Sequence, residues 1–346
     1  MPAEVVEAMV DASHMHIHLD EFNAKAGEEI ARLTGAEAGL VTAGASAGML
    51  LQAAAVMAGG DPANVRSLPD TTGMKNEIVI HRAHRVGEDR NYLAAGAKFV
   101  EIGNSAMAHE WELEAAITEN TAAVAYVFGP PRRGAVSLSR TVEIAHARGV
   151  PVIVDAAAML PPPENLKRYV DMGADMVTFS GGKGLRGPQS TGILCGTREL
   201  IEAAYESSSP NEWGVARAAK VCKEEIAGLI VALNLTAAMD YEATVAGWRA
   251  QCQHIVTVLQ DIPGLRVEVT EAAPEKEEAG SAYPDATIMF EPSWTGPDEA
   301  QITQALESGY PPIYVGSAGP YGGLAVAPVG LLEGDAEIVA DRLYSI

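Results

Sequence analysis

The sequence predicts an α/β fold: a mainly parallel, seven-stranded sheet with helices on both faces, followed by a smaller α+β domain at the C-terminal end. Three observations support this prediction. Short apolar runs alternate with helix-length segments through the first 200 residues, as in sheets that are covered on both faces. Residues 212–258 are nearly all helix formers, and a second group of strand and helix signals follows them. The length of 346 residues is sufficient for two domains.

The elements of the predicted sheet can be placed in order. Residues 23–34 have the periodicity of a helix that ends at Gly35, and residues 38–60 predict a short strand, a small-residue turn and a buried helix. Segments 109–118 and 140–149 are predicted helices. The loop before the last strand is too short for a parallel crossover, so that strand is predicted to be antiparallel. The further strands are predicted at 77–81, 98–103, 122–128, 151–157, 175–180 and 191–196.

These signals divide the chain into an N-terminal arm and helix (1–40), a large domain (41–235) and a small C-terminal domain (236–346). In the small domain the strand candidates are LRVEVT, DATIMFEP and GGLAVAPV, with a helix near DEAQITQALES. The acidic, proline-bearing stretch 271–284 separates the first two strands and is predicted to be a solvated loop.

The charge balance limits the partners of this protein. There are 46 acidic and 24 basic residues, for a net charge of -22, so nucleic acid and anionic membranes are poor partners for the surface as a whole. A pocket for a small anionic ligand remains compatible with this composition. Cys195, Cys222 and Cys252 lack metal or disulfide spacing and are predicted to be core thiols in a reducing compartment. We expect a cytoplasmic protein, because no secretory segment or long apolar run is present.

Lys183 is one of only eight lysines, and it lies among small residues in FSGGKGL (179–185). A lysine that follows a strand is more often a surface residue, but the glycines around this one favour a placed amine. Burial among glycines is expected to lower its pKa, which would allow the amine to form a Schiff base with an aldehyde cofactor. The sequence therefore raises the hypothesis of pyridoxal phosphate.

Three further features fall at the carboxyl ends of predicted strands, where open parallel sheets bind ligands. Asp155 can face the ring nitrogen of the cofactor, which needs a carboxylate partner. The turn at 44–48 precedes a helix and can bind phosphate through backbone N–H groups, with hydroxyl bonds from Ser46 and Ser180. The imidazole of His84 or His81 can stack on the ring. Taken singly, these residues are commonly helix caps or packing residues; their order along the chain is the stronger signal.

Two other segments of the sequence could indicate a different chemistry. His14, His16 and His18 share one face if the segment is extended and could form a metal site resembling the first strand of the amidohydrolases. A metal hydrolase would need more histidines at later strand ends, and the alternative is an arm ordered against a partner subunit, so no metal is expected. GGKG is not a P-loop, because Gly184 replaces the magnesium-binding Ser or Thr.

The segments FSGGKGLRGPQSTGILCG, VIVDAAAML and SLPDTTGMKNEIV resemble the selenocysteine-synthase-like (L-seryl-tRNA selenium transferase-related) branch of fold type I pyridoxal-phosphate enzymes. This branch includes D-glucosaminate-6-phosphate ammonia-lyases. The resemblance implies that Lys183 binds the cofactor, Asp155 meets the pyridine nitrogen and His84 stacks on the ring. It also implies a homodimer or higher homo-oligomer with active sites at the subunit interface, to which Gln189 or the loop 70–76 contributes. The implied phosphate-binding residues are Gly44, Ala45, Ser46 and Ala47.

The implied reaction is α,β-elimination from a small anionic β-hydroxy or sugar-derived amino acid, giving a 2-keto acid and ammonia. Arg186 is the first candidate for the substrate carboxylate, followed by Arg132 or Arg133, and a phosphorylated substrate would also need a residue such as Lys75. Glu88 stands where the resemblance leads us to expect an aromatic residue, which indicates a changed substrate pocket.

Alternatives to this reaction remain open at this point. They are aminotransferase, racemase, aldolase or selenium transferase-like chemistry on the same cofactor and, from another class, a non-catalytic scaffold. The intact pair of Lys183 and Asp155 argues against a scaffold. The acidic composition and the early start of the cofactor domain argue against a tRNA substrate.

Overall fold

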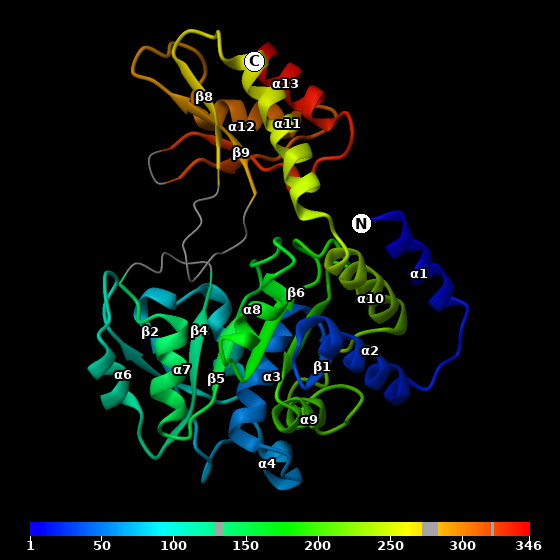
Figure 1. Cartoon of the computed structure of the whole chain (residues 1–346), viewed down its shortest axis with the longest axis vertical. Coiled ribbons are helices and arrows are strands. Elements are labelled where there is room, and N and C mark those ends of the chain that lie inside the picture. Colours follow the sequence, from blue (N-terminus) through cyan, green and yellow to red (C-terminus); the bar gives the residue numbers. More distant parts are fainter. Residues whose placement is uncertain (129–133, 272–282, 320–321) are drawn as a thin grey trace. The chain divides into compact units, whose positions relative to one another are not determined.

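The computed structural model describes residues 1–128, 134–271, 283–319 and 322–346. The chain divides into two compact units: unit 1 comprises Met1–Ala238, and unit 2 comprises the described residues from Met239 onward (Figure 1). The helices of unit 1 are α1 (Ala3–Ser13), α2 (Leu19–Thr34), α3 (Gly44–Ala58), α4 (Pro62–Ser67), η1 (Arg82–His84), η2 (Gly87–Asp89), α5 (Arg90–Ala94), α6 (Glu110–Ala116), α7 (Leu138–His146), α8 (Asn165–Asp171), α9 (Arg198–Glu206) and α10 (Lys223–Ala237).

A seven-stranded sheet forms the centre of unit 1, with strand order β1-β7-β6-β5-β4-β2-β3. Strands β2 to β6 pair in parallel, whereas β7 is antiparallel to both of its neighbours, β6 and β1. The predicted mainly parallel, seven-stranded sheet and its antiparallel last strand are therefore confirmed. The strands are β1 (Ala38–Thr42), β2 (Glu77–His81), β3 (Lys98–Ile102), β4 (Thr121–Val127), β5 (Val152–Asp155), β6 (Met176–Ser180) and β7 (Gly192–Gly196).

The strand side chains alternate between two apolar clusters, one on each face of the sheet. Ile78 and Ile153 belong to the cluster that contains buried residues of α3, α4, α5 and α9. Val79 and Val154, one position further along, belong to the cluster that contains buried residues of α2, α6, α7 and α8. Both faces are therefore covered, as the near-continuous apolar runs of the strands predict.

Glycines allow α3 to lie close to the sheet. A Cβ atom at Gly48 would be 2.1 Å from Thr178 Oγ1 of β6, and one at Gly192 would be 2.6 Å from the carbonyl carbon of Gly44. The preceding helix, α2, ends at Gly35, which adopts the left-handed φ of 73° that glycine favours. The predicted helix end is confirmed.

The helix formers of 212–258 do not all lie in helices, because α10 begins only at Lys223 and α11 at Tyr241. The chain makes turns until Cys222, where Glu225 accepts from the Cys222 backbone N–H and completes the cap of α10. Gly214 packs against the preceding turn so closely that a Cβ there would be 2.3 Å from Ser207 O. Helix propensity was overridden here by that contact.

Unit 2 has its own core, formed by a four-stranded antiparallel sheet of order β10-β11-β9-β8 and three helices. The strand predictions at LRVEVT, DATIMFEP and GGLAVAPV and the helix at DEAQITQALES are confirmed. Most of the predicted acidic loop, residues 272–282, lies outside the described residues. The elements are α11 (Tyr241–Leu259), β8 (Leu265–Thr270), β9 (Asp285–Phe290), α12 (Glu299–Ser308), β10 (Gly316–Ser317), β11 (Leu324–Val326), η3 (Pro328–Gly330) and α13 (Asp335–Ser345).

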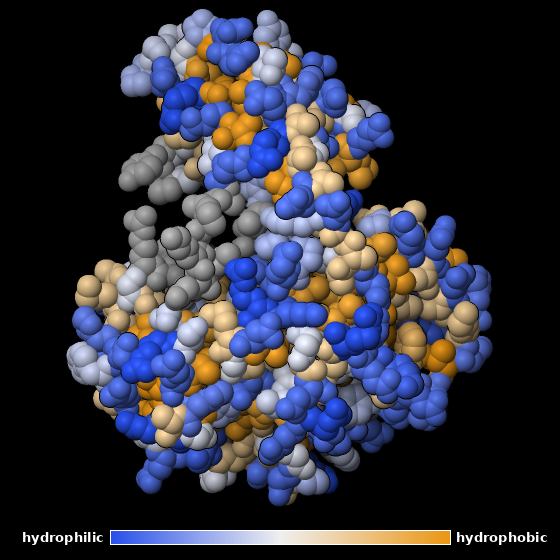
Figure 2. Space-filling view, viewed as in Figure 1, coloured by the Kyte–Doolittle hydropathy of each residue, from blue (hydrophilic) through white to orange (hydrophobic). Residues whose placement is uncertain are grey.

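The face drawn in Figure 2 is mainly hydrophilic, with hydrophobic residues in scattered patches, in keeping with the charged composition. Cys195 and Cys252 are buried, but Cys222 is exposed, so it is not the core thiol that was predicted. The reason is its position as the cap residue of α10, at the protein surface. Within the described ranges, no single helix is long and apolar enough to cross a membrane, and only α10 and α11 taken together pass that test of length and composition.

Candidate active site

The strand register brings the predicted site residues to one edge of the sheet. Ser180 at the end of β6 lies opposite Gly192 of β7, and Gly192 lies opposite Thr42 at the end of β1. Asp155 at the end of β5 is paired with Thr178 of β6. The start of α3, Asp155 and the turn that carries Lys183 are thus neighbours at the carboxyl edge.

Asp155 is buried, with 6% of its surface exposed. Its Oδ1 accepts a hydrogen bond of 2.9 Å from the backbone N–H of Ala157. Burial raises the pKa of Asp155 to about 6, the Ala157 N–H and the Lys183 ammonium oppose that shift, and the Glu88 carboxylate adds to it. Lys183 follows β6, the strand that pairs with the Asp155 strand, so both residues lie at the carboxyl edge of the sheet.

Two positions beside Lys183 accommodate only glycine. Gly181 N donates to Thr191 O, and Gly187 N donates to Gly181 O, both at 2.8 Å. A Cβ at Gly182 would be 2.4 Å from Gln189 Cα, and a Cβ at Gly184 would be 2.0 Å from Leu160 O. Lys183 itself is exposed, so the expectation of a buried amine is wrong. The glycines provide no side chains to cover it.

Helix α3 begins at this edge without a side-chain cap. Its N-cap residue is Ala43, and no described side chain accepts from the first turn. Gly44 adopts a φ of 75°, Ala45 and Ala47 are buried, and Ser46 is exposed. Backbone N–H groups at the start of a 15-residue helix favour an anion such as phosphate. Ser180 is half-buried at the end of β6, beside this turn.

Both histidines lie in a buried aromatic cluster with Tyr126. The ring centroids are 4.7 Å apart for His81 and His84 and 4.5 Å apart for His84 and Tyr126. The backbone N–H of Val136 donates to His81 Nε2 at 3.3 Å, and burial lowers the pKa of His81 to about 4. His84 is fully buried. Strand alternation directs His81 and Tyr126 to the face of the sheet opposite Asp155, and His84 packs on Tyr126. The stacking of His84 on a cofactor ring therefore stays a prediction.

Arg186 has an unusual backbone conformation for its residue type. It is the single non-glycine residue with positive φ, 55°, in the described parts of the chain, and its N–H donates to Lys183 O at 2.9 Å. The side chain is half-buried and forms no ion pair with any described carboxylate. Gln189 is exposed on the same loop. Arg132 and Arg133 lie outside the described residues.

The loop 70–76 lies at the other edge of the sheet. It precedes β2, its Asn76 side chain donates to Thr71 Oγ1 at 2.7 Å, and Asn76 O accepts from Lys98 N at the start of β3. In its own subunit, Lys75 is therefore at the amino edge and away from Lys183. His14, His16 and His18 are exposed between α1 and α2. Among the described residues, no group of three or more His, Cys, Asp or Glu is arranged to hold a metal.

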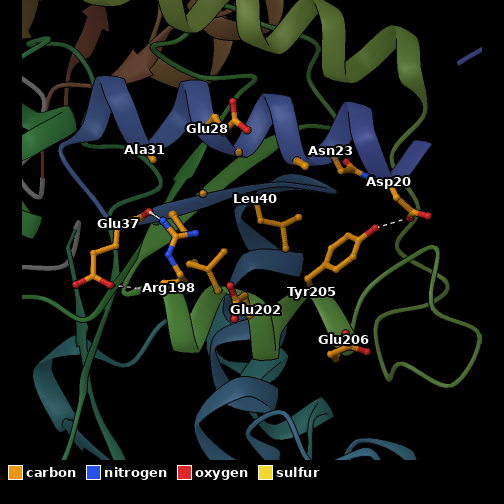
Figure 3. A pocket seen from close by; sticks show the side chains of 15 residues that line it. Asp20, Asn23, Glu28, Ala31, Glu37, Leu40, Arg198, Glu202, Tyr205 and Glu206 are labelled. Carbon is orange, nitrogen blue, oxygen red and sulfur yellow. Dashed lines mark hydrogen bonds between the residues drawn. The ribbon is translucent and has the colours of Figure 1, made fainter. Parts of the chain in front are cut away.

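A cavity of about 420 Å³ also lies toward the amino edge, between α2, β1 and α9 (Figure 3). Tyr205 of α9 points toward Asp20 and donates to its Oδ1 at 2.7 Å. None of the residues predicted for the cofactor site lines this cavity. Two buried residues near Asp155, Gln52 and Tyr92, were not indicated by any motif, and the one signal for Gln52 is that it is polar within an apolar helix.

The carboxyl edge fits pyridoxal phosphate on three observations: an uncapped helix start for phosphate, a buried carboxylate for the ring nitrogen, and a lysine near that carboxylate. The fold and this edge define a fold type I pyridoxal-phosphate-dependent enzyme. A solved serine palmitoyltransferase with pyridoxal phosphate shares the fold, with a TM-score of 0.60 at 14% identity over 100% of this chain and 83% of that one.

Comparison with known proteins gives the family. Residues 3–248 match the SelA family, L-seryl-tRNA selenium transferase, and the chain belongs to this family. A D-glucosaminate-6-phosphate ammonia lyase of Salmonella typhimurium is 33% identical over 99% of this chain and 90% of that protein. A solved structure of a D-glucosaminate-6-phosphate ammonia-lyase has a TM-score of 0.85 at 31% identity and covers 100% of this chain and 90% of that chain.

A second relative has a different activity in its name. A 5'-C-glycyluridine monooxygenase-decarboxylase of a Streptomyces species is 32% identical over 99% of this chain and 84% of that protein. Similar overall identity to both proteins means that the family alone does not select the reaction.

Proposed function

We propose that this protein is a pyridoxal-phosphate-dependent lyase that acts on a small, anionic β-hydroxy or sugar-derived amino acid. The single observation that carries the proposal is the juxtaposition of Lys183 and Asp155 at the carboxyl edge. The identity of 33% to an ammonia lyase along almost the whole chain, together with the TM-score of 0.85 to a solved ammonia-lyase structure, supports a lyase. The net reaction removes the α-proton and the β-hydroxyl as water, and water then releases ammonia and leaves a 2-keto acid.

The side chains have separate tasks in this proposal. The backbone N–H groups of residues 44–47 and the hydroxyl of Ser180 hold the phosphate. Asp155 keeps a proton on the ring nitrogen, and His84 packs against the ring. Bound there, the cofactor supplies an electron-withdrawing ring that stabilises negative charge on the substrate Cα. Lys183 holds the cofactor and, after the substrate amine has replaced it, takes up the α-proton at Nζ.

Arg186 is the proposed partner of the substrate carboxylate. Arg186 follows Lys183 by three residues in the sequence, and its side chain is half-buried. Its guanidinium forms no ion pair with a carboxylate of the described residues. A positive φ is unfavourable for arginine, and the conformation holds this side chain beside the turn of Lys183. The Glu88 carboxylate contributes to the raised pKa of Asp155, so it adds negative charge on the side of the proposed site where the resemblance leads us to expect an aromatic residue.

Three further parts of the proposal concern the whole protein. We propose a homodimer or higher homo-oligomer with Gln189 at a site shared between subunits. We also propose a cytoplasmic location, which the free cysteines support. The proposed domains are an N-terminal arm and helix at 1–40, a large cofactor-binding domain at 41–235 and a small domain at 236–346.

The experiment is an assay of ammonia and keto acid with the cofactor-loaded protein and a panel of D- and L-hydroxy and sugar amino acids, with and without phosphate. The proposal predicts equal amounts of both products from one member of the panel, and neither product from Lys183→Ala. Turnover without ammonia release would contradict it.

The Streptomyces relative supports oxidative decarboxylation as a second candidate. Oxygen consumption and carbon dioxide release, measured on the same panel, distinguish this reaction, because elimination uses no oxygen and releases no carbon dioxide.

A further inference from the structure

Gln52 is a fully buried amide in the middle of α3, where the neighbouring residues are leucine, alanine, methionine and valine. Its Nε2 donates to Val154 O of β5 at 2.9 Å and lies 3.4 Å from Met176 O of β6. Buried polar groups are retained when they are hydrogen-bonded. This amide therefore ties α3 to two neighbouring strands.

Those strands carry the predicted cofactor contacts. Val154 immediately precedes Asp155, and Met176 begins the strand that leads to Ser180 and Lys183. At its other end, α3 presents the uncapped turn 44–47. Gln52 therefore links the helix that begins with the turn 44–47 to the strands that lead to Asp155 and Lys183.

Tyr92 extends the contact to a fourth segment. It is fully buried on α5, and its hydroxyl donates to Gln52 Oε1 at 3.1 Å. Burial and, to a lesser extent, the carboxylates of Asp155 and Asp89 raise the pKa of Tyr92 well above its usual value. The hydroxyl therefore keeps its proton and can donate a hydrogen bond. Helix α5 directly follows the short helices η1 and η2, and η1 contains His84.

We propose that Gln52 and Tyr92 are positioning residues for the cofactor. Their hydrogen-bonded pair holds the phosphate-binding turn, the Asp155 strand, the Lys183 strand and the His84 segment at fixed spacing. The inference rests on the proposed roles of residues 44–47 and Asp155 and does not depend on which substrate is used.

Two substitutions separate the hydrogen bonds from the packing. Gln52→Met keeps a similar volume and removes the polar contacts with Val154 O, Met176 O and the Tyr92 hydroxyl. Tyr92→Phe removes the hydroxyl but keeps the ring, which packs edge-on against Phe99 with centroids 6.2 Å apart. Gln52→Glu is the conservative variant. A buried carboxyl group is held protonated, so it can still donate to Val154 O and accept from Tyr92.

Thr34→Val is the matched control. Thr34 is fully buried, and its hydroxyl donates to Ile30 O at 2.8 Å within α2, which packs on the face of the sheet opposite α3. The control removes this bond and the longer bond of 3.4 Å from the Ala36 N–H. Thr34 is the last residue of α2 and lies outside the elements that carry residues 44–47, Asp155 and Lys183.

The experiment measures the dissociation constant of pyridoxal phosphate by absorbance titration at a temperature well below unfolding, together with the melting temperature of each cofactor-free protein. Loss of one hydrogen bond corresponds to roughly a tenfold change in an equilibrium constant. We expect the dissociation constant to rise about tenfold or more for Gln52→Met and Tyr92→Phe and by less than about threefold for Gln52→Glu and Thr34→Val.

The melting temperature separates positioning from stability alone. If all four variants melt lower while their dissociation constants match the wild type, Gln52 and Tyr92 are only structural and the inference is wrong. If Gln52→Met does not fold, Tyr92→Phe and Gln52→Glu still decide the question. A wild-type protein that binds the cofactor but releases no ammonia would overturn the proposed function and leave this measurement intact.

Discussion

Helices α3 and α9 each begin beside a strand of the central sheet, but their first turns are satisfied in different ways. At the amino edge, the Glu37 carboxylate accepts from the Arg198 N–H at the start of α9 at 3.0 Å, and the Arg198 guanidinium donates to Glu37 O at 2.8 Å (Figure 3). At the carboxyl edge, α3 begins at Gly44 with no side-chain cap from a described residue.

The two helix starts differ in what satisfies their first backbone N–H groups. An anion is favourable at either position because of the backbone N–H groups and the helix dipole. The chain supplies that anion for α9, and we propose that the phosphate of the cofactor supplies it for α3. Substitutions at the two edges should consequently affect different quantities: cofactor binding at the carboxyl edge and only folding stability at the amino edge.

The largest effect is expected for Lys183→Ala. The variant retains the helix start and Asp155 but lacks the amine, so turnover should fall by about a thousandfold or more. The absorbance band near 420 nm of the cofactor-loaded protein should also be lost. Steady-state assays and an absorbance scan check this prediction. Lys25→Ala, which removes an exposed lysine of α2 that pairs with Glu28, is the control and should retain both signals.

The next effect is a pH dependence that Asp155→Asn should remove. In the cofactor-free protein the pKa of Asp155 is raised by burial from 3.8 to about 6, so the folded state binds this proton more tightly than the unfolded chain does. The resulting stability is fully present below about pH 4 and is lost as the pH rises through about 6, a change on the order of 3 kcal/mol.

Urea unfolding of the wild type and Asp155→Asn at pH 4 and pH 7.5 measures this difference. The buried His81 titrates in the same range with the opposite sign, because its pKa is lowered to about 4, but it is present in both proteins and cancels. A stability difference that does not change between the two pH values would show that Asp155 is not the buried acid described above.

Ser46→Asp is expected to change stability and cofactor binding in opposite directions. A carboxylate in the first turn of α3 interacts favourably with the helix dipole and should stabilise the cofactor-free protein by about 0.5 kcal/mol. The same charge repels phosphate, so the cofactor should bind at least about tenfold more weakly. Thermal unfolding and absorbance titration test the two signs, and Ser46→Ala is the control. Unchanged affinity would place the phosphate elsewhere.

The smallest effect is expected at the amino edge. Glu37→Gln weakens the hydrogen bond to the start of α9 and should destabilise the protein by about 1 kcal/mol, with no change in cofactor affinity. Chemical denaturation and the same titration check this pair of outcomes. A weaker cofactor affinity in this variant would mean that the two edges are coupled, contrary to the comparison above.

Much of the fold was predictable because its signals are local. The short apolar strands, the helix that ends at Gly35 and the glycine-bounded turn around Lys183 can each be identified from a few adjacent residues. The common location of Asp155, Lys183 and the start of α3 follows from the rule that parallel strands end at one edge.

The remaining features depend on contacts between distant segments. The burial of both histidines and the contact of Gln52 with Val154, 102 residues away, are set by packing that no short motif encodes. The turns at 212–222 reflect the approach of Gly214 to Ser207, which overrides helix propensity. The position of Lys75 at the amino edge follows from strand order, because the loop 70–76 precedes β2.

The most direct test of the central claim is to locate the covalent bond between protein and cofactor. The protein is loaded with pyridoxal phosphate, reduced with borohydride, digested and analysed by mass spectrometry. The account predicts a reduced pyridoxyl phosphate group on Lys183 in the wild type and none in Lys183→Ala. A modification on another lysine, such as Lys223 at the start of α10, or none at all in a folded, cofactor-saturated protein, would contradict it.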